Sequence, residues 1–343
     1  MSAPLAVAAV VPARNALPDV LDAVESALAQ TLPPAQVVVV DDGSEDGTGD
    51  AVERRFAADP RAAVRVLRGR FGSAAAARNA GWRAASAPWV ALLDADDVWE
   101  PDKLACAAAA LAAAPGVAWF FSDGTFRALA GEVHPSWLGL YADVPEGYVG
   151  SPVAALFEVN FVLTSSVVVR REALEALGGF DESLSHAEDL DLWIRLARRW
   201  PAAGSPRALV RYQHREGGLS GQREQRLDGD VELFGRLAAD PALPEALRRL
   251  ALRRRAVARY KLGLGALRAG DHAGARAQLR GAWHFPERVV PVAVTWALSL
   301  LPPGWTRRLR RETWATRPVG RRFVAPRRVR LEAAGPGTPG RRP

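Results

Sequence analysis

Short apolar runs alternate with segments of helical periodicity along the first half of the sequence, and this alternation limits the possible folds more than any other feature. The runs are β-strand candidates: Leu5–Val11, Val37–Val40, Val64–Leu67 and Trp89–Leu93. Strands that alternate with helices form βαβ units, in which parallel strands are covered by helices. The second run consists of four consecutive valines, as expected of a strand buried on both faces. The sequence therefore predicts an α/β protein with a mostly parallel, Rossmann-like sheet flanked by helices.

The segments between these runs contain clear helix signals. Leu17, Val20, Leu21, Val24 and Leu28 recur at helical spacing, and Pro33-Pro34 ends that helix. Pro101 suits the first turn of a helix that continues to Ala114. Further periodic segments are expected at Phe161–Val169, Glu188–Trp200 and Ala208–Tyr212. The weak pattern between about Thr125 and Ser151 predicts a loop or a small hairpin.

The character of the chain changes beyond Gly221, where helices rich in arginine and alanine are expected. Their predicted ranges are Val231–Leu237, Pro244–Ala269 and His272–Trp283. From about Pro326 the chain is rich in proline, glycine and arginine, which predicts disorder. We therefore expect one α/β domain over residues 1–220, with halves of about 1–122 and 123–220. A helical region over 221–325 and a disordered basic tail over 326–343 follow it.

The formal charge of +7 is concentrated near the end of the sequence. Residues 301–343 contain twelve arginines and two glutamates, a net charge of +10, so the preceding residues carry −3. A basic tail suits anionic lipid or nucleic acid, and a solvated end is the simpler alternative. Because the rest of the chain is not basic, we do not expect a nucleic-acid partner.

Cys106 is the single cysteine, so neither a disulfide framework nor a thiolate metal cluster is expected. No continuous apolar run approaches the roughly 20 residues that cross a bilayer. These features predict a cytoplasmic protein. Val289–Leu301 is apolar, contains Trp296 and precedes the arginines. This segment suits either peripheral contact with the inner face of an anionic membrane or packing against the α/β domain, and both alternatives stay open.

Two acidic motifs follow strand candidates. Asp41-Asp42-Gly43-Ser44 follows the second strand and Asp94-Ala95-Asp96-Asp97 follows the fourth. Ligands of open α/β sheets bind outside the carboxyl ends of the strands, which is where these acids lie. Carboxylates crowded at one strand end repel one another, and a hard cation such as Mg²⁺ or Mn²⁺ would relieve the repulsion. The motifs predict a site for a metal ion and a diphosphate.

Four motifs in order resemble the nucleotide-binding half of family 2 glycosyltransferases. They are Val11-Pro12-Ala13-Arg14-Asn15, Val40-Asp41-Asp42-Gly43-Ser44, Ala77-Arg78-Asn79-Ala80-Gly81 and Leu93-Asp94-Ala95-Asp96-Asp97. The resemblance implies a GT-A fold and an inverting, metal-dependent hexosyltransferase. It also implies that the Asp-x-Asp pair serves the metal, with Asp96 as a ligand and Asp94 toward the ribose. The nucleotide-sugar-binding residues implied by the resemblance are Pro12, Arg14, Asn15, Asp41, Asp42, Arg78, Asp94 and Glu188.

Two downstream segments extend the resemblance. Glu188-Asp189 resembles the family's Glu-Asp segment at the start of an acceptor-side helix, which assigns Asp189 as the base that deprotonates the acceptor hydroxyl. The segment from Arg211 to Ser220 resembles the family's closing segment, in which His214 completes the metal or diphosphate site. The metal ligands expected from the whole resemblance are Asp96, Asp94 and His214.

The function expected is transfer of a sugar from a nucleoside-diphosphate sugar, UDP-linked, to a hydroxyl acceptor in polysaccharide, glycolipid or glycoprotein assembly. The acceptor expected is a glycan or a lipid-linked sugar. A dehydrogenase is disfavoured because the first strand is followed by Pro12-Ala13-Arg14-Asn15 in place of Gly-x-Gly-x-x-Gly. A sugar nucleotidyltransferase is disfavoured because no glycine-rich, lysine-containing loop follows the N-terminus. The alternative from another class is a catalytically silent nucleotide-sugar-binding or scaffold protein of the same fold.

Overall fold

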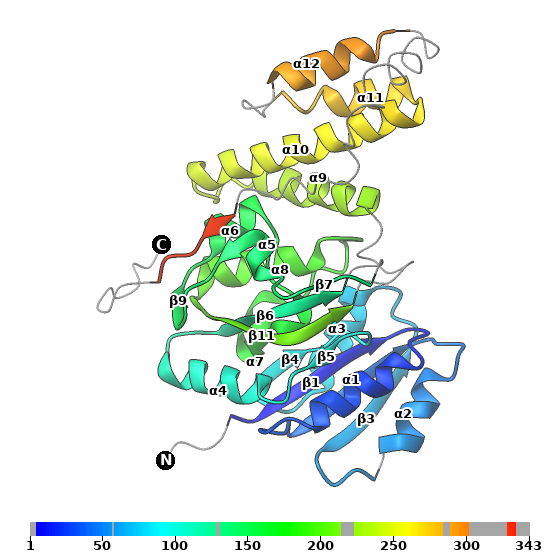
Figure 1. Cartoon of the computed structure of the whole chain (residues 1–343), viewed down its shortest axis with the longest axis vertical. Helices are drawn as coiled ribbons and strands as arrows, with labels where there is room; N and C mark the ends of the chain where they lie inside the picture. Colours follow the sequence, from blue (N-terminus) through cyan, green and yellow to red (C-terminus); the bar gives the residue numbers. More distant parts are fainter. Residues whose placement is uncertain are drawn as a thin grey trace. The chain divides into compact units, whose positions relative to one another are not determined.

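The computed structural model describes residues 5–56, 58–127, 131–213, 223–283, 289–301 and 328–333, with the backbone alone at Arg223. These residues divide into two compact units. Unit 1 lies within Met1–Glu216 and Arg327–Pro343, and unit 2 lies within Gly217–Pro326. Figure 1 shows both, with labels for helices and strands.

Unit 1 is built on one mixed sheet whose first half is parallel (Figure 1). Its strands lie in the order β3-β2-β1-β4 and confirm the four strand predictions. Their bounds are Val7–Ala13 for β1, Gln36–Asp42 for β2, Ala63–Gly69 for β3 and Trp89–Leu92 for β4. All three pairings are parallel, as the alternation with helices requires.

The second half of the sheet mixes strand directions. Strand β10 is antiparallel to both β4 and β6, whereas β11 is parallel to β6 and antiparallel to β5 and β9. The bounds are Val98–Trp99 for β5, Trp119–Arg127 for β6, Tyr148–Gly150 for β9, Val168–Arg170 for β10 and Ala202–Gln213 for β11. The periodic segment expected at Phe161–Val169 contains a 3₁₀ helix over Thr164–Ser166 and the start of β10.

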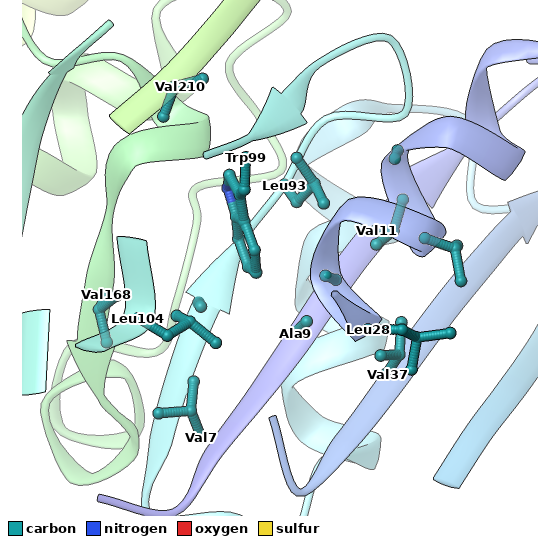
Figure 2. Packing of buried hydrophobic residues seen from close by; sticks show 14 of the residues in the cluster. Val7, Ala9, Val11, Leu28, Val37, Leu93, Trp99, Leu104, Val168 and Val210 are labelled. Atoms are coloured by element: carbon teal, nitrogen blue, oxygen red, sulfur yellow. The ribbon is translucent and has the colours of Figure 1, made fainter. Parts of the chain in front are cut away.

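Helices cover both faces of the parallel half. Strand residues with even and odd numbers face opposite sides. One side packs against α1 (Asp19–Leu28), α2 (Thr48–Phe56) and α4 (Lys103–Ala113), and the other against α3 (Ala74–Ala84). Figure 2 shows the first of these cores, including Val7, Ala9 and Val11 of β1. The sheet is thereby held as a rigid platform for its strand ends.

Unit 1 also contains α7 (Arg171–Leu177) and α8 (Glu188–Arg199). The predicted helix over Glu188–Trp200 therefore agrees with α8 to within one residue. The stripe of Leu190, Trp193, Ile194 and Ala197 is buried, as the periodicity predicts. The acidic first turn of α8 is left at the edge of that core.

The region of weak pattern contains small elements. Strand β7 (Val133–His134) pairs with the end of β6 as a hairpin, and α5 (Leu138–Tyr141), β8 (Ala142–Asp143) and α6 (Val153–Glu158) follow. Strand β12 (Val329–Arg330) pairs in parallel with β8. Residues 328–333 therefore differ from the disorder predicted for 326–343. The reason is that Val329 and Leu331 bury apolar side chains within an arginine-rich segment.

Unit 2 is helical. Its helices are α9 (Arg223–Ala239), α10 (Glu245–Ala269), α11 (His272–Leu279) and α12 (Val289–Leu298). Helix α9 begins before Val231, where the sequence predicted its start. The prediction was late because the buried apolar residues of α9 lie in its second half, and only that half shows helical periodicity. Gly263 lets α11 approach α10, since a Cβ there would lie 2.8 Å from Leu279. Within the described residues, no helix combines the length and apolar character that spanning a bilayer requires.

Candidate active site

The acidic motifs lie at one edge of the sheet because three parallel strands end there. In the register of the sheet, Val10 of β1 lies between Val38 of β2 and Leu92 of β4. Asp42 closes β2, and Asp94 follows β4 by two residues. The motifs after β1, β2 and β4 therefore come out on the same side, as predicted from the strand-end rule.

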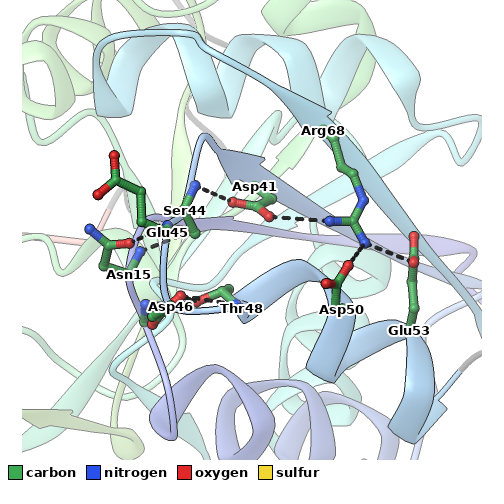
Figure 3. Close-up of polar contacts among 10 residues, drawn as sticks. Asn15, Asp41, Ser44, Glu45, Asp46, Thr48, Asp50, Glu53 and Arg68 are labelled. Carbon is green, nitrogen blue, oxygen red and sulfur yellow. Dashed lines mark hydrogen bonds and ion pairs between the residues drawn. The ribbon is translucent and has the colours of Figure 1, made fainter.

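Asn15 joins the loop after β1 to the loop after β2 (Figure 3). Its backbone has a φ of +48°, a left-handed conformation that asparagine tolerates better than most residues. The Asn15 side-chain oxygen accepts the N–H of Glu45 at 2.8 Å, and the Asn15 N–H donates to Ser44 Oγ at 3.0 Å. Asn15, a predicted nucleotide-binding residue, thus holds the two loops together.

Asp41 and Asp42 have different surroundings. The Asp41 carboxylate accepts the Ser44 N–H at 2.9 Å and lies 3.8 Å from Arg68 Nη1, so it fastens the turn (Figure 3). The Asp42 carboxylate accepts the N–H groups of Phe71 and Gly72. Both side chains are largely buried. Of the predicted nucleotide-sugar-binding residues that precede them, Pro12 is partly buried and Arg14 is exposed.

Arg78 connects the two halves of unit 1. It reaches from α3 to Asp94 Oδ1 through Nη2 and to Glu188 Oε1 through Nη1, both at 2.8 Å. Its guanidinium lies 5.5 Å from the centre of the Phe180 ring. Burial would lower the pKa of Arg78, but the charges of Asp94 and Glu188 outweigh burial and hold that pKa above its ordinary value. In this structure the guanidinium of Arg78 thus pairs with two acidic side chains.

The acids after β4 divide into two kinds. Asp97 points into the fold, where its carboxylate accepts Ser165 Oγ at 2.6 Å and the Gln213 N–H at 3.1 Å. Burial, then the charges of Asp94 and Asp96, raise the pKa of Asp97 well above its ordinary value. Asp97 therefore fastens β11 and the 3₁₀ helix to this loop.

Asp96 and Asp94 form the pair that suits a divalent cation. Burial, and then the charge of Asp94, raise the pKa of Asp96 to about 6. A cation beside Asp96 would offset both of these effects on its pKa. No three His, Cys, Asp or Glu side chains of the described residues converge closely enough to hold an ion by themselves. A pair fits Mg²⁺ or Mn²⁺, which take their other ligands from water and substrate phosphates. The predicted ligand His214 lies outside the described residues.

Asp189 lies at the first turn of α8, beside Glu188. Burial of the carboxylate, and then the charge of Glu188, raise the pKa of Asp189 to about 6. Its Oδ2 accepts a hydrogen bond from Asn160 Nδ2 at 3.0 Å. Ala187, just before the helix, has a φ of +65°, which is unusual for alanine and sets the direction in which the helix begins. A carboxylate with a pKa near neutrality suits proton transfer.

Sequence reasoning missed three contributors. Ser165 donates to Asp97 and accepts the Asp94 N–H, Phe180 lies beside Arg78, and Asn160 donates to Asp189. None of them stands in a motif with a recognisable spacing. Asn160 and Phe180 lie in the loops that follow α6 and α7, and Ser165 lies in the 3₁₀ helix, so the sequence pattern contained no signal for them.

Comparison with known proteins shows which family the chain resembles. The model of "Glycosyl transferase family 2" matches residues 8–177, and that of "Glycosyltransferase like family 2" matches residues 150–242. The succinoglycan biosynthesis protein ExoO of Rhizobium meliloti is 35% identical over 258 residues, 71% of this chain and 68% of that protein. The putative teichuronic acid biosynthesis glycosyltransferase TuaG of Bacillus subtilis is 40% identical over 98 residues, 29% of this chain and 38% of that protein.

Solved structures share the fold. Residues 1–349 of S. aureus TarS, in complex with UDP-GlcNAc, align with a TM-score of 0.63 at 18% identity, covering 88% of this chain and 87% of that one. The mannosyltransferase PcManGT of Pyrobaculum calidifontis, in complex with GDP-Man and Mn²⁺, aligns with a TM-score of 0.58 at 23% identity, covering 89% and 84%. The fold is that of the GT-A glycosyltransferases. The chain belongs to glycosyltransferase family 2.

Proposed function

We propose that this glycosyltransferase moves a hexosyl group from a UDP-linked sugar to a hydroxyl group of a glycan or lipid-linked sugar, with inversion at the anomeric carbon. The observation that carries the proposal is the Arg78 bridge, which joins Asp94 of the Asp-x-Asp pair to Glu188 beside Asp189. Residues 110 positions apart in the chain are thereby held at one place. The names of the relatives in succinoglycan and teichuronic acid biosynthesis favour polysaccharide assembly.

The chemistry that we propose assigns one task to each side of the bridge. Asp189 accepts the proton of the attacking hydroxyl group. As it does so, the hydroxyl oxygen bonds to the anomeric carbon, and the bond between that carbon and the diphosphate oxygen breaks. The diphosphate leaves with that electron pair. Asp96 and Asp94 would hold Mg²⁺ or Mn²⁺, which supplies positive charge for the diphosphate when bound. Direct displacement from the face opposite the leaving group inverts the anomeric centre.

For the nucleotide, we propose that Asp42, Pro12 and Arg14 contact the base and that Asp94 lies toward the ribose. Asp41 and Asn15 contribute by holding the loops around the base. We also propose that His214 binds the metal or the diphosphate. Glu188 is proposed to contribute to donor binding through Arg78. These roles rest on family membership and on the shared sheet edge.

The test is release of nucleoside diphosphate from UDP-, GDP- and dTDP-sugars with Mn²⁺ or Mg²⁺. We expect turnover with a UDP-sugar, loss of activity in EDTA, and a loss of at least 10²-fold for Asp189→Asn with nucleotide binding retained. Asp96→Ala should weaken metal-dependent nucleotide binding in a thermal-shift titration. Full activity of Asp189→Asn, or turnover insensitive to EDTA and to Asp96→Ala, would contradict the mechanism. Binding of a nucleotide sugar without turnover of any donor would favour the silent binding protein.

We also propose that the protein is cytoplasmic and contacts the inner face of an anionic membrane through its C-terminal region. Helix α12 packs through Val292 and Thr295 and exposes the apolar side chains of Val290 and Val294. Residues 289–301 contain no charged side chain, and residues 301–343 carry a net charge of +10. An apolar face beside positive charge is complementary to a surface of anionic lipid.

A further inference from the structure

Asn160 occupies the loop between α6 and the 3₁₀ helix and touches the proposed base directly. Its Nδ2 donates to Asp189 Oδ2 at 3.0 Å. The other end of the same amide, Oδ1, is buried and has no hydrogen-bond partner among the described residues. One side chain therefore holds the base at one end and has an unused acceptor at the other.

The chemistry of the carboxylate determines which way this amide points. An ionised carboxylate only accepts hydrogen bonds, so the NH₂ group of Asn160 must face Asp189 and Oδ1 must face away from it. A buried acceptor without a partner is costly, and such groups in native proteins usually meet a ligand or an ordered water. The donor that Asn160 Oδ1 lacks is what a hydroxyl group supplies.

We propose that Asn160 is a positioning residue that orients Asp189 through Nδ2 and receives a hydroxyl of the sugar acceptor at Oδ1. The inference rests on the proposed role of Asp189 as the base. It deepens that role, since the acceptor must present a second hydroxyl near the one that attacks. Adjacent hydroxyls are a property of sugars, whereas simple alcohols and serine or threonine side chains carry one.

The charged groups that face Asp189 are Glu188 on its own helix and Arg78 from α3, with Asp94 behind Arg78. Burial and Glu188 raise the pKa of Asp189, whereas Arg78 and the Asn160 hydrogen bond lower it. Removing Asn160 therefore raises this pKa further. Because the base works as the carboxylate, the acidic limb of the pH profile should move to higher pH.

The experiment compares Asn160→Ala and the isosteric Asn160→Asp with the unchanged chain. The measurement is the pH dependence of nucleoside diphosphate release from the UDP-sugar, with water as acceptor. Asn160→Ala should shift the acidic limb to higher pH by about one unit. At pH values on that limb, this shift is a tenfold loss of rate. Asn160→Asp should move it further, because it places a second carboxylate beside the first. Ser151→Ala is the matched control, since it removes a side-chain hydrogen bond to Ala197 O near the other end of α8.

A second measurement reads the same pKa without turnover. Because the pKa of Asp189 is raised from 3.8 to about 6, its contribution stabilises the fold at low pH and is lost as pH rises through 6. The difference in unfolding free energy between the chain and Asp189→Asn, followed from pH 4 to 8, reports this loss. In an Asn160→Ala background the loss should occur at higher pH.

The outcomes separate the two proposals. An active Asp189→Asn variant would remove the proposed function and this inference with it. If Asp189→Asn is inactive but neither Asn160 variant shifts the acidic limb of the pH profile or the pH dependence of stability, the proposed function stands and only this inference is overturned. A shift of equal size in Ser151→Ala would also overturn it, because the effect would then belong to α8 as a whole.

Discussion

At the scale of single residues, Lys103 shows how differently one side chain behaves from the expectation for its type. Lysine is almost never fully buried without a partner. Lys103 is nevertheless buried, and its Nζ lies 3.9 Å from the centre of the Trp99 ring with no hydrogen-bond partner among the described residues. Burial lowers its pKa well below the ordinary value of 10.5. Lys103 therefore costs stability that an apolar side chain would not.

Replacing Lys103 with methionine should stabilise unit 1. Methionine has similar length and lacks the amine, and burial of a polar group without a hydrogen bond costs about 1–3 kcal/mol. Below pH 10.5 the unfolded chain binds this proton more readily than the folded chain, so the lysine's contribution improves as pH rises. Urea unfolding between pH 7 and 9.5 should show the largest gain at pH 7. Lys261→Met, at an exposed position of α10, is the control, and an equal gain there would contradict the explanation.

At the scale of elements, the seating of α3 on the sheet decides where Arg78 reaches. Gly81 of α3 has no side chain, and a Cβ there would lie 2.4 Å from Val10 Cγ1 and 2.9 Å from Val40 Cγ2. Both valines belong to buried strands and have no room to move. The glycine of the Ala77-Arg78-Asn79-Ala80-Gly81 motif therefore serves packing, whereas the arginine pairs with Asp94 and Glu188.

Gly81→Ala should destabilise unit 1 by about 1–3 kcal/mol, because overpacking outweighs the gain in helix propensity. Chemical denaturation followed by circular dichroism measures the change. Gly265→Ala is the matched control in α10, where the nearest atom to the added Cβ lies at 3.6 Å. The control should be neutral or slightly stabilising. A Gly81→Ala protein as stable as the control would show that α3 is not held this closely.

At the scale of the whole molecule, the exposed apolar side chains are concentrated in unit 2. Those in residues 283–300 are Trp283, Val289, Val290, Val294 and Leu300, whereas unit 1 exposes Val133 among its described residues. Helix α12 still packs on its other side, where Val292, Leu279 and Ala282 form a small core. The exposed face is therefore available without unfolding the unit.

Vesicle cosedimentation tests this face in the full chain. Binding is expected with vesicles that contain phosphatidylglycerol and should fall with rising salt, because the basic segment contributes attraction that ions screen. Val290→Asp with Val294→Asp should reduce binding at least tenfold, and Val133→Asp should not. The membrane proposal would be contradicted if the double variant bound as well as the unchanged chain, or if neutral and anionic vesicles bound equally. It would also be contradicted if the unchanged chain were a dimer that the double substitution converts to a monomer.

Much of the fold was predictable because its signals are local. The apolar runs and helical periods located β1 to β4, α1, α4 and α8. Burial of one face of a helix or strand requires apolar residues at a regular spacing within a short segment, which the sequence shows directly. The antiparallel strands of the second half were harder. Short strands such as β5 and β10 depend on which partner they meet, and pairing partners are distant in the chain.

By itself, the sequence determined the family, the parallel sheet and the acids at its strand ends, because each depends on spacing within a few residues. The tertiary structure alone decided which contacts each acid makes. Asp97 turns inward to Ser165 and Gln213, Asp41 holds a turn, and Arg78 brings Glu188 to Asp94. The physical reason is that a side chain's protonation and direction depend on burial and on partners that folding brings from far along the chain.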